Sequence, residues 1–253
     1  MNESNPLSQN ESPNQTTPKR EPRELGDDPV EREPVGGVFA AIETVLRQPR
    51  RIMFQLRQPG SGKLVGAMLL TTVVCSFLYG VVVGSFSGHE QWWAAPVKIS
   101  AGMLLSALVC LPSLYIFCCL SGSQARLREM LGLVAGLLML TSILLIGFAP
   151  VAWLFSQSSS SLSWMGFLHL LFWSIATVFG VRFLASALIH SRARTSTGLS
   201  AWIFIFVLVV LQMSAALRPI VGRADTFLPT EKKFFLAHWV LSLEQESREG
   251  FNR

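Results

Sequence analysis

Residues 130–168 read MLGLVAGLLMLTSILLIGFAPVAWLFSQSSSSLSWMGFL, 39 residues without one formal charge. A helix that crosses a membrane needs about 20 predominantly apolar residues, so this stretch is long enough for two crossings. Gln157 and the serines at 158–161 and 163 divide it, which predicts one span over 130–155 and a second over 162–189. Each span is expected to be an α-helix, because hydrocarbon offers the backbone no external hydrogen-bond partners.

The same pattern extends in both directions along the chain. Three further apolar blocks of spanning length lie at 64–88, 99–120 and 199–217. Half of the 253 residues are hydrophobic and only 15% are charged, whereas a soluble domain carries about 25% charged residues. Between Glu90 and Asp225 the sole acidic residue is Glu129. The sequence therefore predicts an all-α integral membrane helical bundle with about five transmembrane helices.

The segments before the first span differ in character. Residues 1–34 carry eight acidic against four basic residues and few large apolar side chains, which predicts a disordered N-terminal tail. Residues 35–63 have apolar residues at helical spacing, and Pro49 is expected to separate two short helices. The basic residues of this segment are Arg47, Arg50, Arg51, Arg57 and Lys63. We expect an amphipathic interfacial segment whose bases contact anionic lipid headgroups; a helix packed on the cytoplasmic side is the alternative.

The distribution of basic residues predicts the orientation. With a cytoplasmic N-terminus, nine bases flank the inner ends of the spans and five, Lys98 among them, lie on the outer side, as the positive-inside rule requires. Four tryptophans would then form an aromatic belt at the outer interface: Trp92, Trp93, Trp153 and Trp164. We expect a cell-membrane protein, in the inner membrane of a bacterium, with residues 218–253 as a C-terminal surface segment.

Small residues and prolines within the spans bear on helix packing. Gly80 and Gly84 form a G-x-x-x-G pair in the first span, and Gly132 and Gly136 form another in the third. Such pairs let helices approach closely in lipid, either inside one bundle or between two copies of the chain, so a homodimer is possible. Pro112 and Pro150 predict helix kinks, or broken helices of the kind that build ion sites in transporters.

Few side chains in the spans offer chemistry. His169 is a functional candidate, because ionisable residues inside a membrane are costly; a structural histidine bonded to a neighbouring carbonyl is the alternative. Arg182 is expected to reach water at the inner end of its span, and Gln212 to hydrogen-bond between helices. Gly60-Ser61-Gly62-Lys63 lacks the remainder of a phosphate loop, and the cysteines and histidines have no metal-ligand spacing. We expect no cofactor, no nucleic-acid partner and no enzymatic activity.

Several short motifs, in this order, resemble a family of uncharacterised bacterial multi-pass membrane proteins of cyanobacterial and planctomycete type. They are Leu111-Pro112-Ser113-Leu114-Tyr115, Gly122-Ser123, Phe148-Ala149-Pro150 and Leu217-Arg218-Pro219-Ile220-Val221-Gly222. The resemblance covers residues 38–240 and implies a membrane location and a helix count, but no activity. The layout of a flexible tail before five spans is also similar to that of the Yip1 family of membrane-trafficking proteins, at the level of fold alone.

Two functions are compatible with these features. The absence of recognisable chemistry, beside a polar tail and a basic segment, favours a non-enzymatic membrane scaffold that recruits protein partners through its N-terminal tail and anionic lipid through its bases. The alternative is a channel or transporter for a small solute. Its path would be lined by Pro112, Pro150, His169 and Gln212.

Overall fold

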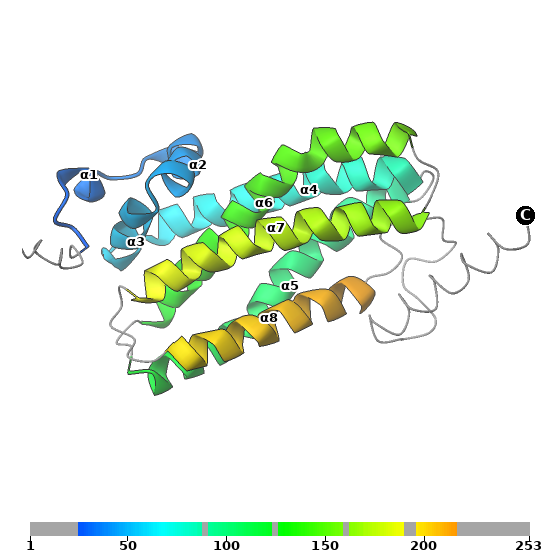
Figure 1. Ribbon diagram of the computed structural model, residues 1–253. Helices are drawn as coiled ribbons and strands as arrows, with labels where there is room; N and C mark the ends of the chain where they lie inside the picture. The colour runs from blue at the N-terminus through cyan, green and yellow to red at the C-terminus, as the bar shows by residue number, and fades with distance from the viewer. Residues whose placement is uncertain (1–24, 88–90, 123–125, 159–161, 190–195, 217–253) are drawn as a thin grey trace, which may run out of the picture.

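The computed structural model describes residues 25–87, 91–122, 126–158, 162–189 and 196–216. Within these ranges the regular elements are helices, and five long ones run side by side in a bundle (Figure 1). The long helices are α4 (Gly62–Ser87), α5 (Gln91–Leu120), α6 (Leu127–Ser158), α7 (Leu162–Ile189) and α8 (Ser196–Ala216). Three short helices, α1 (Pro29–Arg32), α2 (Gly37–Arg47) and α3 (Pro49–Arg57), lie at one end of the bundle.

The composition and length of the long helices match a bilayer. Helices α4 to α7 are each long and apolar enough to cross a membrane. Helix α8 has 21 residues, but its apolar part, Gly198–Met213, is shorter than the apolar stretches of the other four. Large apolar side chains such as Leu108 and Val109, which are 63% and 59% exposed, cover the outer faces. The chain is an all-α membrane helical bundle.

Helix α6 is the central element of the bundle. It packs against α4 and α7, and every residue from Gly132 to Met139 is buried, so this part of α6 is covered on all sides. Helix α8 instead packs on α5, where the fully buried Trp202 donates from its indole Nε1 to the carbonyl oxygen of Cys110 at 3.0 Å. A hydrogen bond between two helices therefore supports the packing of α8.

The glycine motifs serve contacts inside the bundle. A Cβ atom on Gly80 of α4 would overlap the backbone of Pro96 in α5, and one on Gly136 of α6 would lie 2.5 Å from the ring of Phe183 in α7. Gly132 of α6 faces the side chain of Leu56 in α3 in the same way. The second glycine of the first motif, Gly84, is buried as well. These surfaces are occupied by side chains and backbone of the same chain.

Most predicted boundaries agree with the structure within a turn. Helix α6 ends at Ser158 and α7 begins at Leu162, so the predicted division into two helices is confirmed, while residues 159–161 lie outside the described residues. Helix α3 begins with Pro49 in its first turn. The predicted start of the second span at residue 99 is wrong, because α5 begins at Gln91 and its apolar stretch at Trp92. Lys98, which was expected on the outer side, lies within the first turns of α5 and is 1% exposed. A lysine can lie inside a helix end when its methylene stem packs against neighbouring helices.

The prediction of a disordered tail also needs a correction. Residues 1–24 and 217–253 lie outside the described residues, but residues 25–34 are placed and contain α1. Asp28 caps this helix by accepting a hydrogen bond from the backbone N–H of Val30 at 3.0 Å, and Pro29 occupies the first turn. Composition predicted disorder here because the segment is polar, whereas polar contacts with α3 hold it in place.

Adding a methyl group at the contact of α4 with α5 should destabilise the bundle. Gly80→Ala forces a shift of the Pro96 backbone, and overpacking of this kind costs about 1–3 kcal/mol. The matched control is Gly66→Ala in the same helix, where a Cβ meets no atom within 4 Å. Thermal unfolding in detergent should show a lower midpoint for Gly80→Ala only; equal midpoints for the two variants would contradict the close approach.

Candidate functional site at the capped end of the bundle

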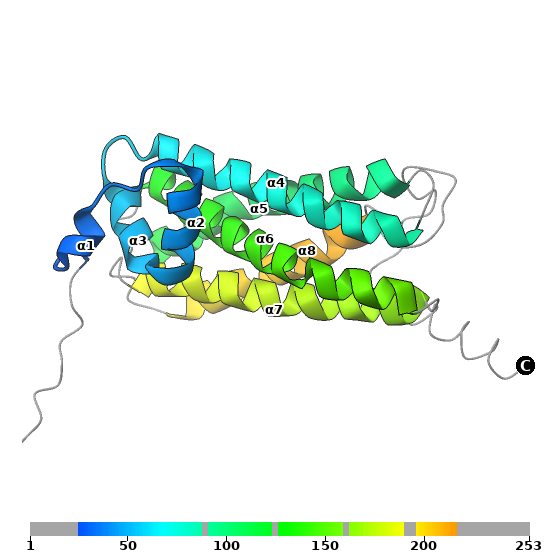
Figure 2. The same cartoon turned by 90° about the horizontal axis from the view of Figure 1, so that it is seen from above.

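Residues 25–57 form a cap on the end of the bundle where α4 begins. Helices α2 and α3 run across the direction of the long helices (Figure 2) and contact α4 and α6. The cap is attached through apolar side chains that are at most 3% exposed: Ala41, Val45, Ile52, Met53 and Leu56. Burying an isoleucine, methionine or leucine contributes about 1.5–3 kcal/mol each. The inner faces of α2 and α3 are therefore packed against the bundle, which was the alternative to contact with lipid headgroups.

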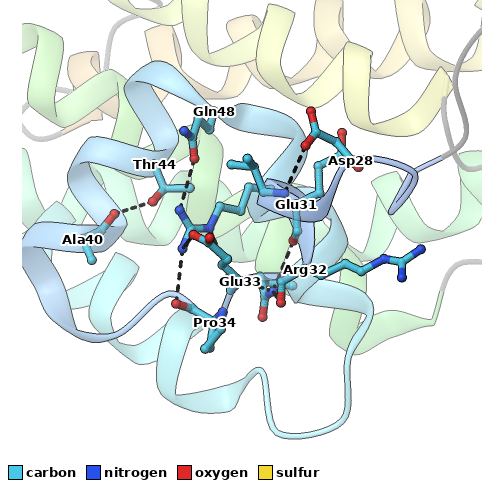
Figure 3. Close-up of polar contacts among 11 residues, drawn as sticks. Asp28, Glu31, Arg32, Glu33, Pro34, Ala40, Thr44 and Gln48 are labelled. Carbon is cyan, nitrogen blue, oxygen red and sulfur yellow. Dashed lines mark hydrogen bonds and ion pairs between the residues drawn. The ribbon is translucent and has the colours of Figure 1, made fainter.

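The first part of the cap, residues 25–34, is here named the strap. Its residue Glu31 is 7% exposed and accepts from the Nε of Arg50 in α3 at 2.6 Å. The second carboxylate oxygen of Glu31 accepts from the backbone N–H of Gly26 at 2.5 Å, while Arg32 donates to the carbonyl oxygen of Gly26 at 2.7 Å. The buried carboxylate thus has both an arginine and a backbone partner. Figure 3 shows Glu31 and Arg32 beside Asp28 on the strap.

Two more side chains of α3 hold the strap. Arg51 donates through Nε to the carbonyl oxygen of Glu33 at 3.0 Å, and its Nη2 lies 3.4 Å from the carboxylate of the same residue. Nε2 of Gln55 lies 3.1–3.3 Å from the carbonyl oxygens of Glu31, Arg32 and Glu33. One face of α3 therefore binds the strap through polar atoms, and the opposite face binds the bundle through apolar ones.

The five bases predicted to contact headgroups fall into two groups. Arg50 and Arg51 have the strap as their partner. Arg47 pairs with Glu43 one turn away at 3.3 Å, with both side chains largely exposed, and Arg57 and Lys63 are exposed. Headgroup contact stays a prediction for all five. For Arg50 and Arg51 it requires that the strap give way.

The outer face of α2 carries apolar side chains in spite of its position outside the long helices. Phe39 is 88% exposed and Leu46 is 48% exposed. They lie seven residues apart, on the same side of the helix. Because Ala41 and Val45 of the same helix are buried against the bundle, α2 has two apolar faces and only one of them is covered within the described residues.

A second polar group lies between the long helices, in the half of the bundle away from the cap. The hydroxyl of Tyr79 in α4 and Nδ1 of His169 in α7 are 2.8 Å apart, and both side chains are buried. Nε2 of His169 is buried without a hydrogen-bond partner among the described residues. Nearby in sequence, Ser76 of α4 donates to Ser100 of α5 at 3.0 Å. These bonds tie α4 to both α5 and α7.

The structure does not bring together the other residues that were predicted to line a solute path or to form polar contacts between helices. Pro112, Pro150 and Gln212 are all exposed on the described bundle, so His169 alone of the proposed path is buried. Helices α5 and α6 continue through their prolines. Arg182 is exposed, seven residues before the end of α7.

Sequence reasoning did not single out Glu31, Gln55 or Tyr79. For Glu31 a signal existed, because Asp28 followed by Pro29 is a typical helix start and predicts order within the acidic segment. Tyr79 is one of two tyrosines in the chain and lies within a span, where a hydroxyl needs a partner. That this partner is His169 follows only from the arrangement of α4 and α7.

Comparison with known proteins adds no family assignment. No family model matches the chain, and no curated protein or solved structure matches it.

Removing the Tyr79 hydroxyl should destabilise the contact of α4 with α7. Tyr79→Phe leaves Nδ1 of His169 buried without its partner, at a cost of about 1–2 kcal/mol. The control is Tyr115→Phe on α5, whose side chain is 37% exposed. We expect thermal unfolding in detergent to shift for Tyr79→Phe alone. Equal shifts in the two variants would show that the Tyr79–His169 hydrogen bond contributes nothing to stability.

Proposed function

We propose that this protein is a non-enzymatic membrane scaffold whose bundle anchors a docking surface for another protein. The observation that carries the proposal is the side chain of Phe39, which is 88% exposed on a helix that is itself packed onto the bundle. A phenylalanine outside the spanning helices leaves a large apolar area uncovered unless a protein partner or lipid contacts it, and we assign this contact to a protein. The docking surface consists of Phe39 and Leu46.

The structure of the cap suits this role. Binding costs less when the binding surface is already ordered, and the apolar face of α2 and α3 fixes the cap to α4 and α6. Beside the two apolar side chains, the exposed pair of Glu43 and Arg47 offers polar contacts at the rim. An apolar centre with a polar edge is the usual composition of a protein interface.

We further propose that the cap faces the cytoplasm of a bacterium and that the bundle spans its inner membrane. The bases of α2 and α3, together with Arg126 and Arg128 near the start of α6, gather at the capped end. Four exposed tryptophans lie near the opposite helix ends, as an outer aromatic belt would. They are Trp92, Trp93, Trp153 and Trp164.

A pathway for a small solute is a second candidate, supported by the buried Tyr79–His169 pair and the unpartnered Nε2 of His169. The exposure of Pro112, Pro150 and Gln212 speaks against it, because a path needs groups that converge. In liposomes the protein should give no solute or ion flux above the lipid background. A flux that Tyr79→Phe abolishes would replace the scaffold with a transporter.

Photo-crosslinking in native membranes tests the docking surface. A photoreactive phenylalanine analogue at position 39 should form a discrete adduct with another protein, and Leu46→Glu in the same chain should abolish that adduct. The control position is Val178 in α7, which is 51% exposed and should label lipid. If position 39 labels no protein, or labels lipid as position 178 does, the proposed docking surface is wrong.

A further inference from the structure

The polar face of α3 has the composition of an oxyanion site. It presents two guanidinium groups, of Arg50 and Arg51, and the amide of Gln55. In the structure these donors bind the carboxylates of Glu31 and Glu33 and a row of strap carbonyl oxygens. Guanidinium groups bind carboxylate and phosphate oxygens with the same planar geometry. A phosphate could therefore take the place of the strap carboxylates.

The position of α3 brings this face to the headgroup layer. Four residues, 58–61, connect α3 to α4, and Leu56 packs over Gly132 near the start of α6. The 26 residues of α4 and 32 of α6 extend about 39 Å and about 48 Å, whereas the hydrocarbon core is about 30 Å thick. Both helices therefore project into the headgroups, where lipid phosphates are concentrated.

The polar contacts between the strap and α3 can be replaced by contacts between α3 and another anion. In the Arg51–Glu33 pair the Glu33 side chain is 64% exposed, and a pair with so exposed a partner is weak in water. In the Arg50–Glu31 pair the Arg50 side chain is 36% exposed and the Glu31 side chain 9%, so this pair is partly buried and Arg50 must gain another anion when the strap opens. The strap contributes few apolar contacts to the cap: Leu25 packs, partly buried, against the core, and Gly26 lies against the ring of Phe54. Electrostatic competition can thus decide whether the strap stays bound.

We propose that the strap is a displaceable cover over an anionic-headgroup site formed by Arg50, Arg51 and Gln55. Phosphates of anionic phospholipids replace Glu31 and Glu33 on α3, and the strap with its acidic residues is released from the cap. The inference rests on the proposed function only in placing the cap at the membrane surface; the docking surface on α2 is a separate face.

Hydrogen exchange of the full chain in lipid nanodiscs measures directly whether the strap is bound to α3. In phosphatidylcholine the backbone amides of Gly26, Val30 and Glu31 should be protected, because each of these N–H groups has an acceptor within the strap. With phosphatidylglycerol added, these amides should exchange about tenfold faster or more, since each arginine gains roughly a factor of five in its attraction to an anionic surface. Peptides from the buried faces of α2 and α3 should stay protected and show that the cap remains folded.

Variants separate the strap contact from general charge effects. Glu31→Gln should speed exchange of the strap in phosphatidylcholine alone. Arg50→Gln combined with Arg51→Gln should do the same and remove the response to phosphatidylglycerol. Glu43→Gln breaks only the exposed pair on α2 and should leave both the protection and the response unchanged.

Three results would overturn the proposal. Equal strap exchange in the two lipid compositions, with Glu31→Gln still accelerating it, would show a cover that lipid does not displace. Unchanged exchange in Glu31→Gln would show that this carboxylate does not hold the strap. Opening by inorganic phosphate in phosphatidylcholine to the same extent would assign the site to a free anion instead of a lipid. Because these readouts concern the strap, they can fail while photo-crosslinking from position 39 succeeds, and the reverse.

Discussion

In hydrocarbon the backbone finds hydrogen-bond partners only within its own helix, and the rest of the structure follows from this constraint. The five long helices satisfy it, and their hydroxyl side chains follow the same rule. Thr72 donates to the carbonyl oxygen of Met68 and Thr141 to that of Leu137, each one turn earlier. Polar groups that cannot bond locally must meet across helices, as Tyr79 and His169 do.

Inside the bilayer, close packing decides which helices associate, because hydrophobicity does not distinguish contact with lipid from contact with another helix. Lipid tails are as apolar as leucine, so helices associate through shape, and Gly80 against Pro96 shows how near two backbones come when one side chain is absent. The cap is held by different interactions because it lies outside the long helices. Its inner face gains from leaving water, while the strap is held by charge and hydrogen bonds.

The spans, the serine-rich break and the division at Pro49 could be predicted from sequence because each depends on local composition. Amphipathicity showed that α2 and α3 have an apolar face, but not whether bilayer or bundle covers it, since both are apolar. The partners of Glu31 and His169 lie 19 and 90 residues away. They depend on how helices are arranged in space. The burial of Lys98 could not be predicted for the same reason, because neighbouring helices cover its side chain.

Topology mapping tests most directly whether hydrocarbon surrounds α4 to α8. Reporter fusions after residues 60, 125, 160, 195 and 250 place one reporter before the bundle, one between each later pair of helices, and one beyond α8. Five crossings from a cytoplasmic cap predict reporters inside at 60, 125 and 195 and outside at 160 and 250; 60 and 125 share a side because two helices separate them. Reporters that all lie on one side of the membrane, or a pair flanking a single helix on the same side, would contradict the account.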